Sequence, residues 1–243
     1  MRIRKRDICL FLATLGIAGA TVAAALRSKS ITPPHQAQQE DFSQYPIADA
    51  TAPKPTDPKK IAKRKAKSKK YAQYERMVGP GVKGSFIYHW GPDFPELPVA
   101  QSDAVILGTV AEARAELTEN ESGVYSEFTI NINEVLKDDS QQPLSQGDSI
   151  VVDRPGGRVK YGTGQMSLFW LQGFGMPGEG RQYVLFIERG GPDEDYRIIT
   201  GYEMRQGRVY PLDRATGNVT NFGIYTNWEE ASFLNKIRNA VAQ

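Results

Sequence analysis

The sequence contains very little sulfur or imidazole chemistry. A single cysteine, Cys9, and two histidines occur among its 243 residues. One thiol cannot form an internal disulfide, and so few Cys and His ligands exclude disulfide-rich scaffolds, zinc fingers and Cys-x-x-Cys redox motifs. The remaining composition, 40% apolar and 24% charged, is that of a globular chain, which excludes collagen and a multi-span membrane protein.

Charge is distributed unevenly along the chain. Residues 1–80 contain 16 basic and 6 acidic side chains, whereas residues 81–243 contain 14 basic and 22 acidic ones. The two parts therefore carry net charges of +10 and −8. One hypothesis is autoinhibition, in which the basic part folds back on the acidic part, and salt would weaken such a contact.

The first 26 residues are typical of an export signal. Residues 2–6 are mostly cationic, and residues 8–26 form a run of 19 uncharged residues. As a helix this run would be about 28 Å long, close to the thickness of a bilayer core, so it suits a retained single-pass anchor. Its small-residue triplets also suit cleavage by a signal peptidase. We expect residues 1–26 to be a signal peptide or a signal anchor. The rest of the chain is then exported, either held at the cell envelope or secreted or periplasmic after cleavage.

Two segments follow the apolar run. Residues 27–57 are rich in Pro, Gln and Ala, a composition that predicts a disordered tether. Residues 58–80 are predicted to form a basic helix, because Asp57 can cap it and Pro58 suits its first turn. Residues 61, 62, 66, 74, 77 and 78 give this helix a ragged apolar stripe. The predicted surface-binding cations of this segment are Lys59, Lys60, Lys63, Arg64, Lys65, Lys67, Lys69 and Lys70.

The basic segment has two interpretations. In the first it attaches the protein to an anionic membrane or cell-wall surface, since a lysine near acidic lipid contributes about 1 kcal/mol. In the second it is a solvated spacer. Lysine clusters also bind nucleic acid phosphates, but we expect no nucleic acid partner because the protein is predicted to be exported.

Residues 81–243 have the pattern of a β domain. Phe128, Ile130 and Ile132 alternate with polar residues, which predicts a half-buried strand. Seven strands in all are predicted, at residues 102–113, 125–133, 148–153, 182–188, 196–203, 208–212 and 218–222. That number of short strands is typical of a small barrel or sandwich. A C-terminal helix is predicted at residues 228–242, capped by Thr226 or Asn227 and apolar at Phe233, Leu234, Ile237 and Val241.

The order of these features resembles a known family. The features are Ser102-Asp103-Ala104-Val105 entering a long strand, a second strand from Tyr125 to Lys137, Gly147-Asp148, the stretch Gly180 to Phe186, and a closing helix at Trp228. This order resembles the OB-like barrel of netrin modules, of tissue inhibitors of metalloproteinases and of secreted bacterial domains. The resemblance implies a mainly β fold: a small OB-like barrel of six or seven strands with a C-terminal helix, preceded by the apolar helix and the linker.

The resemblance also implies a non-enzymatic interaction role with a protein partner that the sequence does not identify. In the metalloproteinase inhibitors a disulfide-bonded N-terminal cysteine chelates the protease metal. Residues 81–243 contain no cysteine. The inhibitory activity is therefore not expected here.

No cofactor or metal site is expected. Residues 173–178 have the glycine spacing of a dinucleotide-binding turn, but Pro177 and the strand that follows leave no room for the helix that such a turn requires. Trp170, which precedes this loop, and Phe174, which lies in it, form a candidate aromatic binding surface, although Trp170 is also typical of a core residue. His89 lacks partners for a zinc site or a catalytic triad.

An alternative function rests on the acids. A hydrolase of the cell envelope can work with two carboxylates in a barrel cleft. Two buried acids that face one cavity and have raised pKa values would distinguish it. Residues 193–195, Asp-Glu-Asp, are predicted to be a solvated hairpin loop, since the spacing of a calcium loop is missing.

Overall fold

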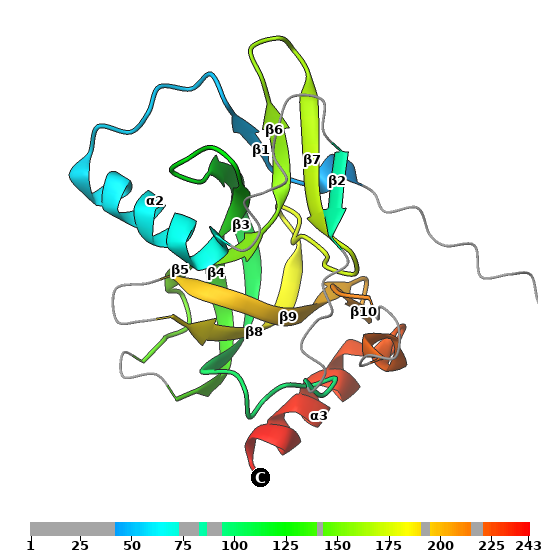
Figure 1. The fold of residues 1–243 in the computed structure, drawn as a ribbon. Helices are drawn as coiled ribbons and strands as arrows, with labels where there is room; N and C mark the ends of the chain where they lie inside the picture. Colours follow the sequence, from blue (N-terminus) through cyan, green and yellow to red (C-terminus); the bar gives the residue numbers. More distant parts are fainter. Residues whose placement is uncertain (1–41, 73–82, 87–93, 140–142, 191–194, 215–220) are drawn as a thin grey trace, which may run out of the picture. The chain divides into compact units, whose positions relative to one another are not determined.

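The computed structural model describes residues 42–72, 83–86, 94–139, 143–190, 195–214 and 221–243 (Figure 1). These residues form a mainly β structure with a C-terminal helix, as predicted. The export segment at residues 1–26 lies outside them. Within the described residues, no helix combines the length and the apolar character needed to cross a membrane.

Ten strands are present in the described part of the chain. They are β1 (Ile47–Asp49), β2 (Lys83–Phe86), β3 (Ala104–Leu117), β4 (Val124–Asp138), β5 (Ser149–Pro155), β6 (Gly157–Lys160), β7 (Met166–Leu171), β8 (Gln182–Arg189), β9 (Tyr196–Arg205) and β10 (Arg208–Pro211). The helices are η1 (Phe42–Gln44), α2 (Pro58–Tyr71), η3 (Phe222–Tyr225) and α3 (Glu230–Val241).

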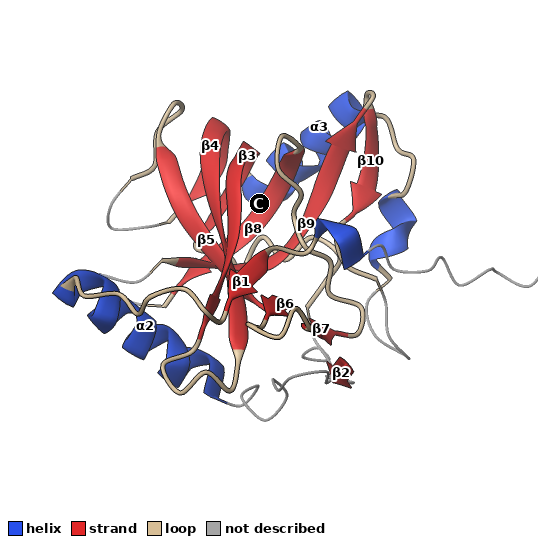
Figure 2. Ribbon diagram, turned by 90° about the horizontal axis from the view of Figure 1, so that it is seen from above, coloured by secondary structure: helices blue, strands red, loops and turns tan. Residues whose placement is uncertain are grey.

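The strands form two sheets. The larger has the order β10-β9-β5-β4-β3-β8, and β9 also pairs with β8. The pairings therefore run from β3 through β4, β5, β9 and β8 back to β3, and only the pair β5–β9 is parallel. The smaller sheet has the order β1-β6-β7-β2. Both views show the large sheet between α2 and α3 (Figures 1 and 2).

The alternation predicted for residues 125–133 is confirmed by β4 from Phe128 onward, whereas residues 125–127 are all buried. Phe128 and Ile130 are fully buried and Ile132 is almost so, whereas Asn131 is exposed. They pack against buried residues of β3, β5 and β8. Each such side chain contributes about 1.5–3 kcal/mol through burial, so this face of β4 stabilises the large sheet.

Two glycines turn the chain from the large sheet into the small one. Gly156 and Gly157 have φ values of +111° and +151°, which side chains rarely adopt. A Cβ on Gly157 would also lie 3.1 Å from side-chain atoms of both Ala115 and Val124. The glycine pair therefore allows β6 to leave the direction of β5 and to pair with β1 and β7.

Helix α3 covers one side of the large sheet, as predicted. Phe233 and Ile237 are fully buried, and they belong to one apolar cluster with Tyr202 of β9. The predicted start at residue 228 is wrong. Residues 227 and 228 instead exchange backbone hydrogen bonds with Val209 of β10, so the helix begins only at Glu230, after Glu229.

Other predicted boundaries also need correction. Part of the segment predicted as a disordered tether is ordered, because β1 pairs in parallel with β6 and Tyr45 and Ala48 are buried. Phe222, predicted to end a strand, lies in η3, and residues 218–220 lie outside the described residues. Strands β1, β2, β6 and β7 were not predicted from the sequence.

Candidate functional site: a basic helix on an acidic face

Helix α2 begins where the sequence predicts. The side chain of Asp57 accepts a hydrogen bond from the backbone N–H of Lys59 at 2.9 Å, and Pro58 occupies the first turn. The helix ends at Tyr71, with Ala72 as its cap, and not near residue 80. Residues 73–80 lie outside the described residues.

Three carboxylates from neighbouring strands lie under α2. Glu127 of β4 is the register partner of Asp153 of β5. Asp195 directly precedes β9, whose residue Arg197 pairs with Asp153. We call Glu127, Asp153 and Asp195 the acidic face. Because β4, β5 and β9 are adjacent, the sheet itself brings these three acids together.

Two lysines of α2 neutralise this face. Lys63 Nζ lies 3.1 Å from Glu127 Oε1 and 2.7 Å from Asp195 Oδ2. Lys67 contacts the Asp153 carboxylate and lies 3.1 Å from Asp195 Oδ2. Lys67 is only 4% exposed, which is rare for lysine and requires a paired partner.

Asp153 is the centre of the contact. It is fully buried and accepts hydrogen bonds from Lys67, from Lys70 at 3.0 Å and from the hydroxyl group of Tyr71. The ring of Tyr71 stacks on Tyr125 of β4, with 5.7 Å between centroids. Three donors on one buried carboxylate fix the C-terminal half of α2 to β5.

Arg64 fixes the helix at a second place. Its guanidinium donates to the backbone carbonyl of Leu117 at 2.8 Å and to that of Thr118 at 3.0 Å. Ser68 accepts a hydrogen bond from the backbone N–H of Glu119. The loop after β3 is therefore joined to α2 by backbone groups, independently of the acidic face.

The first turn of α2 and its side away from the sheet are exposed. The exposed residues are Lys59 and Lys60 in the first turn, followed by Ile61, Ala62, Lys65, Ala66 and Lys69. Among the residues that the structure describes, these four lysines form no ion pair. The eight cations predicted to bind a surface are thus divided: Lys63, Arg64, Lys67 and Lys70 contact the β domain, and the other four, which we call the outward lysines, are exposed.

The pKa values follow from this pairing. Burial disfavours the charged form of Lys67 by more than the nearby acids favour it, so the pKa of Lys67 is lowered. Burial also opposes the charges of Lys63 and Asp195, but there the attraction is larger. The hydrogen bond and charge of Asp195, with the charge of Glu127, raise the pKa of Lys63 despite burial of its ammonium group. Burial alone would raise the pKa of Asp195. The hydrogen bond from Lys63 and the charge of Lys67 lower this pKa by more than burial raises it, so the net shift is downward. Lys63 and Asp195 are both held in their charged forms.

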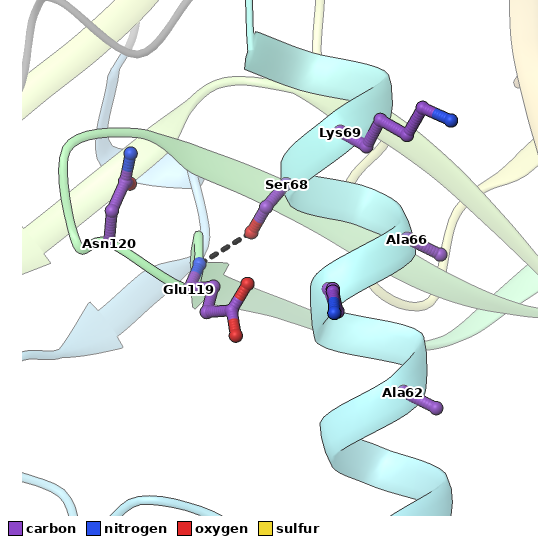
Figure 3. A pocket seen from close by; sticks show the side chains of 7 residues that line it. Ala62, Ala66, Ser68, Lys69, Glu119 and Asn120 are labelled. Carbon is purple, nitrogen blue, oxygen red and sulfur yellow. Dashed lines mark hydrogen bonds between the residues drawn. The ribbon is translucent and has the colours of Figure 1, made fainter.

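A pocket of about 650 Å³ lies between α2 and residues 119–120 (Figure 3). Figure 3 shows the hydrogen bond between Ser68 and Glu119 beside it. The residues that line this pocket are Ala62, Lys65, Ala66, Ser68, Lys69, Glu119 and Asn120. A second pocket, of about 410 Å³, lies beside η1 and includes Glu179. Neither of these two pockets is lined by two acids, so neither offers the carboxylate pair that a hydrolase of the predicted kind requires.

The two aromatic residues predicted as a binding surface pack within the domain. Trp170 of β7 is half-buried, and its ring lies 5.0 Å from the ring of Phe42. Phe174 is half-buried and lies under the Arg154 guanidinium at 4.8 Å. The backbone carbonyl of Phe174 accepts a hydrogen bond from the Tyr45 hydroxyl. These contacts make both residues part of the packing around η1 and β7.

A buried ion pair fastens the glycine-rich loop. Arg154 donates to both carboxylate oxygens of Asp213, at 2.6 and 2.7 Å, and both side chains are buried. Asp213 also accepts from the backbone N–H of Gly175 and from the Thr200 hydroxyl. Strand β8, and no helix, follows this loop, so its glycine spacing does not form a dinucleotide-binding turn.

The remaining candidates are placed as follows. His89 and residues 193 and 194 lie outside the described residues. The prediction that Asp195 lies in a solvated loop is wrong, because Lys63 and Lys67 of α2 cover it. Among the described residues, no group of three or more His, Cys, Asp or Glu side chains is arranged to hold a metal ion.

Comparison with known proteins adds no family: no family model matches the chain, and no curated protein matches it. The site therefore rests on its own geometry. Sequence reasoning named all the cations of α2 but did not identify their partners Glu127, Asp153 and Asp195. The signal that pointed to these partners was the opposite net charge of the two parts of the chain.

Proposed function

We propose that the protein is an exported, non-catalytic interaction module. In this proposal an OB-like β-barrel carries α2 on its acidic face, and the outward lysines of α2 attach the module to an anionic surface of the cell envelope. Residues 1–26 direct export and either remain as an anchor or are removed.

The cycle of strand pairings supports the barrel. Five strands, β3, β4, β5, β9 and β8, follow one another around the cycle with a single parallel pair. A five-stranded, partly open barrel of this connectivity is the OB fold, which serves mainly for binding. The proposal keeps the resemblance to netrin-type modules from the sequence, without the cysteine chemistry of the inhibitors.

The observation that carries the proposal is the outward face of α2. Lys59, Lys60, Lys65 and Lys69 are exposed beside Ile61, which is 44% exposed. Cations next to exposed apolar side chains are the pattern of a helix that lies on an anionic lipid surface. Four lysines at about 1 kcal/mol each supply about 4 kcal/mol, close to a thousandfold in affinity.

Co-sedimentation with vesicles tests the proposal. The protein is prepared as residues 27–243, without the apolar segment, and mixed with vesicles of phosphatidylcholine alone or with added phosphatidylglycerol. We expect binding only to the anionic vesicles, release at about 0.5 M salt, and loss of binding in K59Q/K60Q/K65Q/K69Q. Isolated cell-wall material replaces the vesicles in a parallel arm.

The matched control removes exposed cations elsewhere. Lys160 and Lys236 are exposed on β6 and α3, so K160Q/K236Q lowers the net charge without touching α2. This variant should bind as the wild type does. Equal binding by the quadruple variant and the wild type, or equal binding to neutral vesicles, would contradict the proposal.

A further inference from the structure

The docking of α2 resembles that of a ligand on a binding surface more than that of a core helix. A core helix buries its apolar stripe. The buried residues of α2 are instead Lys67, Ser68 and Tyr71, while Ile61 and two alanines face outward. Interfaces this polar are typical of contacts that can be exchanged.

The acidic face is built without α2. Strand register alone places Glu127 beside Asp153, and Asp195 begins the approach to β9. Like charges this close on one side of a sheet repel one another. The face therefore requires cations, whatever supplies them.

The fit of α2 to this face is incomplete. Glu127 Oε1 and Asp195 Oδ2 are buried, and both share the one ammonium group of Lys63, which lies 3.1 Å from the first and 2.7 Å from the second. One ammonium group shared by two carboxylates leaves part of their acceptor capacity unused. A basic segment that gives each of these two carboxylates its own donor would therefore bind the face more favourably.

We propose that the acidic face is a binding site for a lysine-rich helical segment of a partner protein, and that α2 fills this site within the chain. The partner segment carries cations at the spacing of Lys63, Lys67 and Lys70, so that they lie on one side of its helix. An aromatic residue next to the last cation takes the place of Tyr71 on Tyr125. The inference does not rest on the proposed function, because it uses the inward lysines of α2 and not the outward ones.

Helix α2 is attached to the rest of the chain at both ends, and this attachment determines how strongly it competes with a partner segment for the acidic face. Strands β1 and β2 flank α2 in the sequence and belong to one sheet. A tethered segment competes at an effective concentration in the millimolar range. The wild-type chain should therefore bind a separate basic helix weakly, and release of α2 should restore the full affinity.

Fluorescence anisotropy tests this with a labelled peptide that has the sequence of residues 57–72. The full chain is held in detergent micelles. K63Q/K67Q/K70Q removes the lysines that pair α2 with the acidic face and leaves its contacts through Arg64 and Ser68. It should bind the peptide at least tenfold more tightly than the wild type does. Addition of D195N to that variant should weaken peptide binding again, because it removes part of the acidic face.

The control keeps α2 in place. K59Q/K60Q/K65Q/K69Q changes only outward lysines and should bind the peptide as weakly as the wild type. This separates the inference from the proposed function, since the same variant should no longer bind anionic vesicles. If circular dichroism shows that the triple variant does not fold, K63Q alone takes its place, because the side chain of Lys63 is 37% exposed. A smaller increase in affinity for the peptide is then expected.

Two results would overturn the inference. The first is a folded variant that binds the peptide no more tightly than the wild type. The second is peptide binding that D195N leaves unchanged, since the peptide would then bind elsewhere.

Discussion

The ammonium group of Lys67 contacts the carboxylate of Asp153, and both side chains are buried. The two residues are 86 positions apart in the sequence. Their contact joins the basic helix to the middle of the β domain, and it turns the charge segregation of the chain into a specific interface.

Loss of Asp153 should destabilise the protein strongly. D153N removes the charge that three donors share, and breaking a buried pair costs about 3–5 kcal/mol because the partner charge stays buried. Urea denaturation followed by circular dichroism measures this. K69M, at an exposed site of the same helix, should change the stability by less than about 0.5 kcal/mol. Equal effects of the two substitutions would show that Asp153 and Lys67 are not paired.

Arg154 and Asp213 form a second buried pair with a different role. R154M should also cost about 3–5 kcal/mol, because Asp213 is left buried without its partner. Salt should not change this loss, since both side chains are almost completely buried and screening acts mainly on exposed charges. Urea denaturation at low and high salt checks it. A loss that disappears at high salt would contradict the buried geometry.

The sequence predicted the elements whose pattern is strong. Strand β4 alternates over its whole central part, α3 has an unbroken apolar stripe, and Asp57-Pro58 is a local helix start. Strand β7 was not predicted, because residues 166–171 are nearly all apolar and show no alternation. Strand β6 was not predicted, because its four residues are too few to show a period. Strand β1 was not predicted, because three residues between prolines carry no periodic signal.

The candidate site was predicted only in part. The cations of α2 are visible as a cluster in the sequence, but the direction in which they face depends on tertiary contacts with β4, β5 and β9. The apolar stripe of α2 gave the opposite indication, since exposed alanines and Ile61 resemble a docking face. The charge totals alone suggested that the two parts of the chain attract each other.

The contribution of Asp195 should depend on pH in a defined direction. The pKa of Asp195 is lowered below its ordinary value of 3.8, so its stabilising effect is complete above that pH and is lost as the pH falls through the lowered value. D195N should therefore be less stable than the wild type at pH 7 by about 1 kcal/mol. The difference should disappear in strong acid.

The matching group is Lys63, whose pKa is raised above 10.5. Its contribution is present below that pH and is lost as the pH rises through the raised value. K63Q should thus approach the wild type in stability only at strongly alkaline pH. Urea denaturation across the pH range measures both variants, and a gap between wild type and D195N that widens in acid would contradict the assignment.

The register of β4 can be tested by a charge in the core. I130D places a carboxylate at a fully buried position without a partner, so the variant should fail to fold at neutral pH. N131D adds the same group one residue away, where the side chain is exposed, and should be tolerated. Circular dichroism distinguishes the outcomes. A folded, soluble I130D protein would mean that the alternation has been assigned to the wrong face.

The most direct test of the account is hydrogen exchange of residues 58–71 in the full chain. If α2 is docked, its backbone amides should exchange slowly, and the protection should decrease in K63Q/K67Q/K70Q while it stays unchanged in K59Q/K60Q/K65Q/K69Q. Exchange of these amides in the wild type as fast as in an isolated peptide of residues 57–72 would contradict the docked helix.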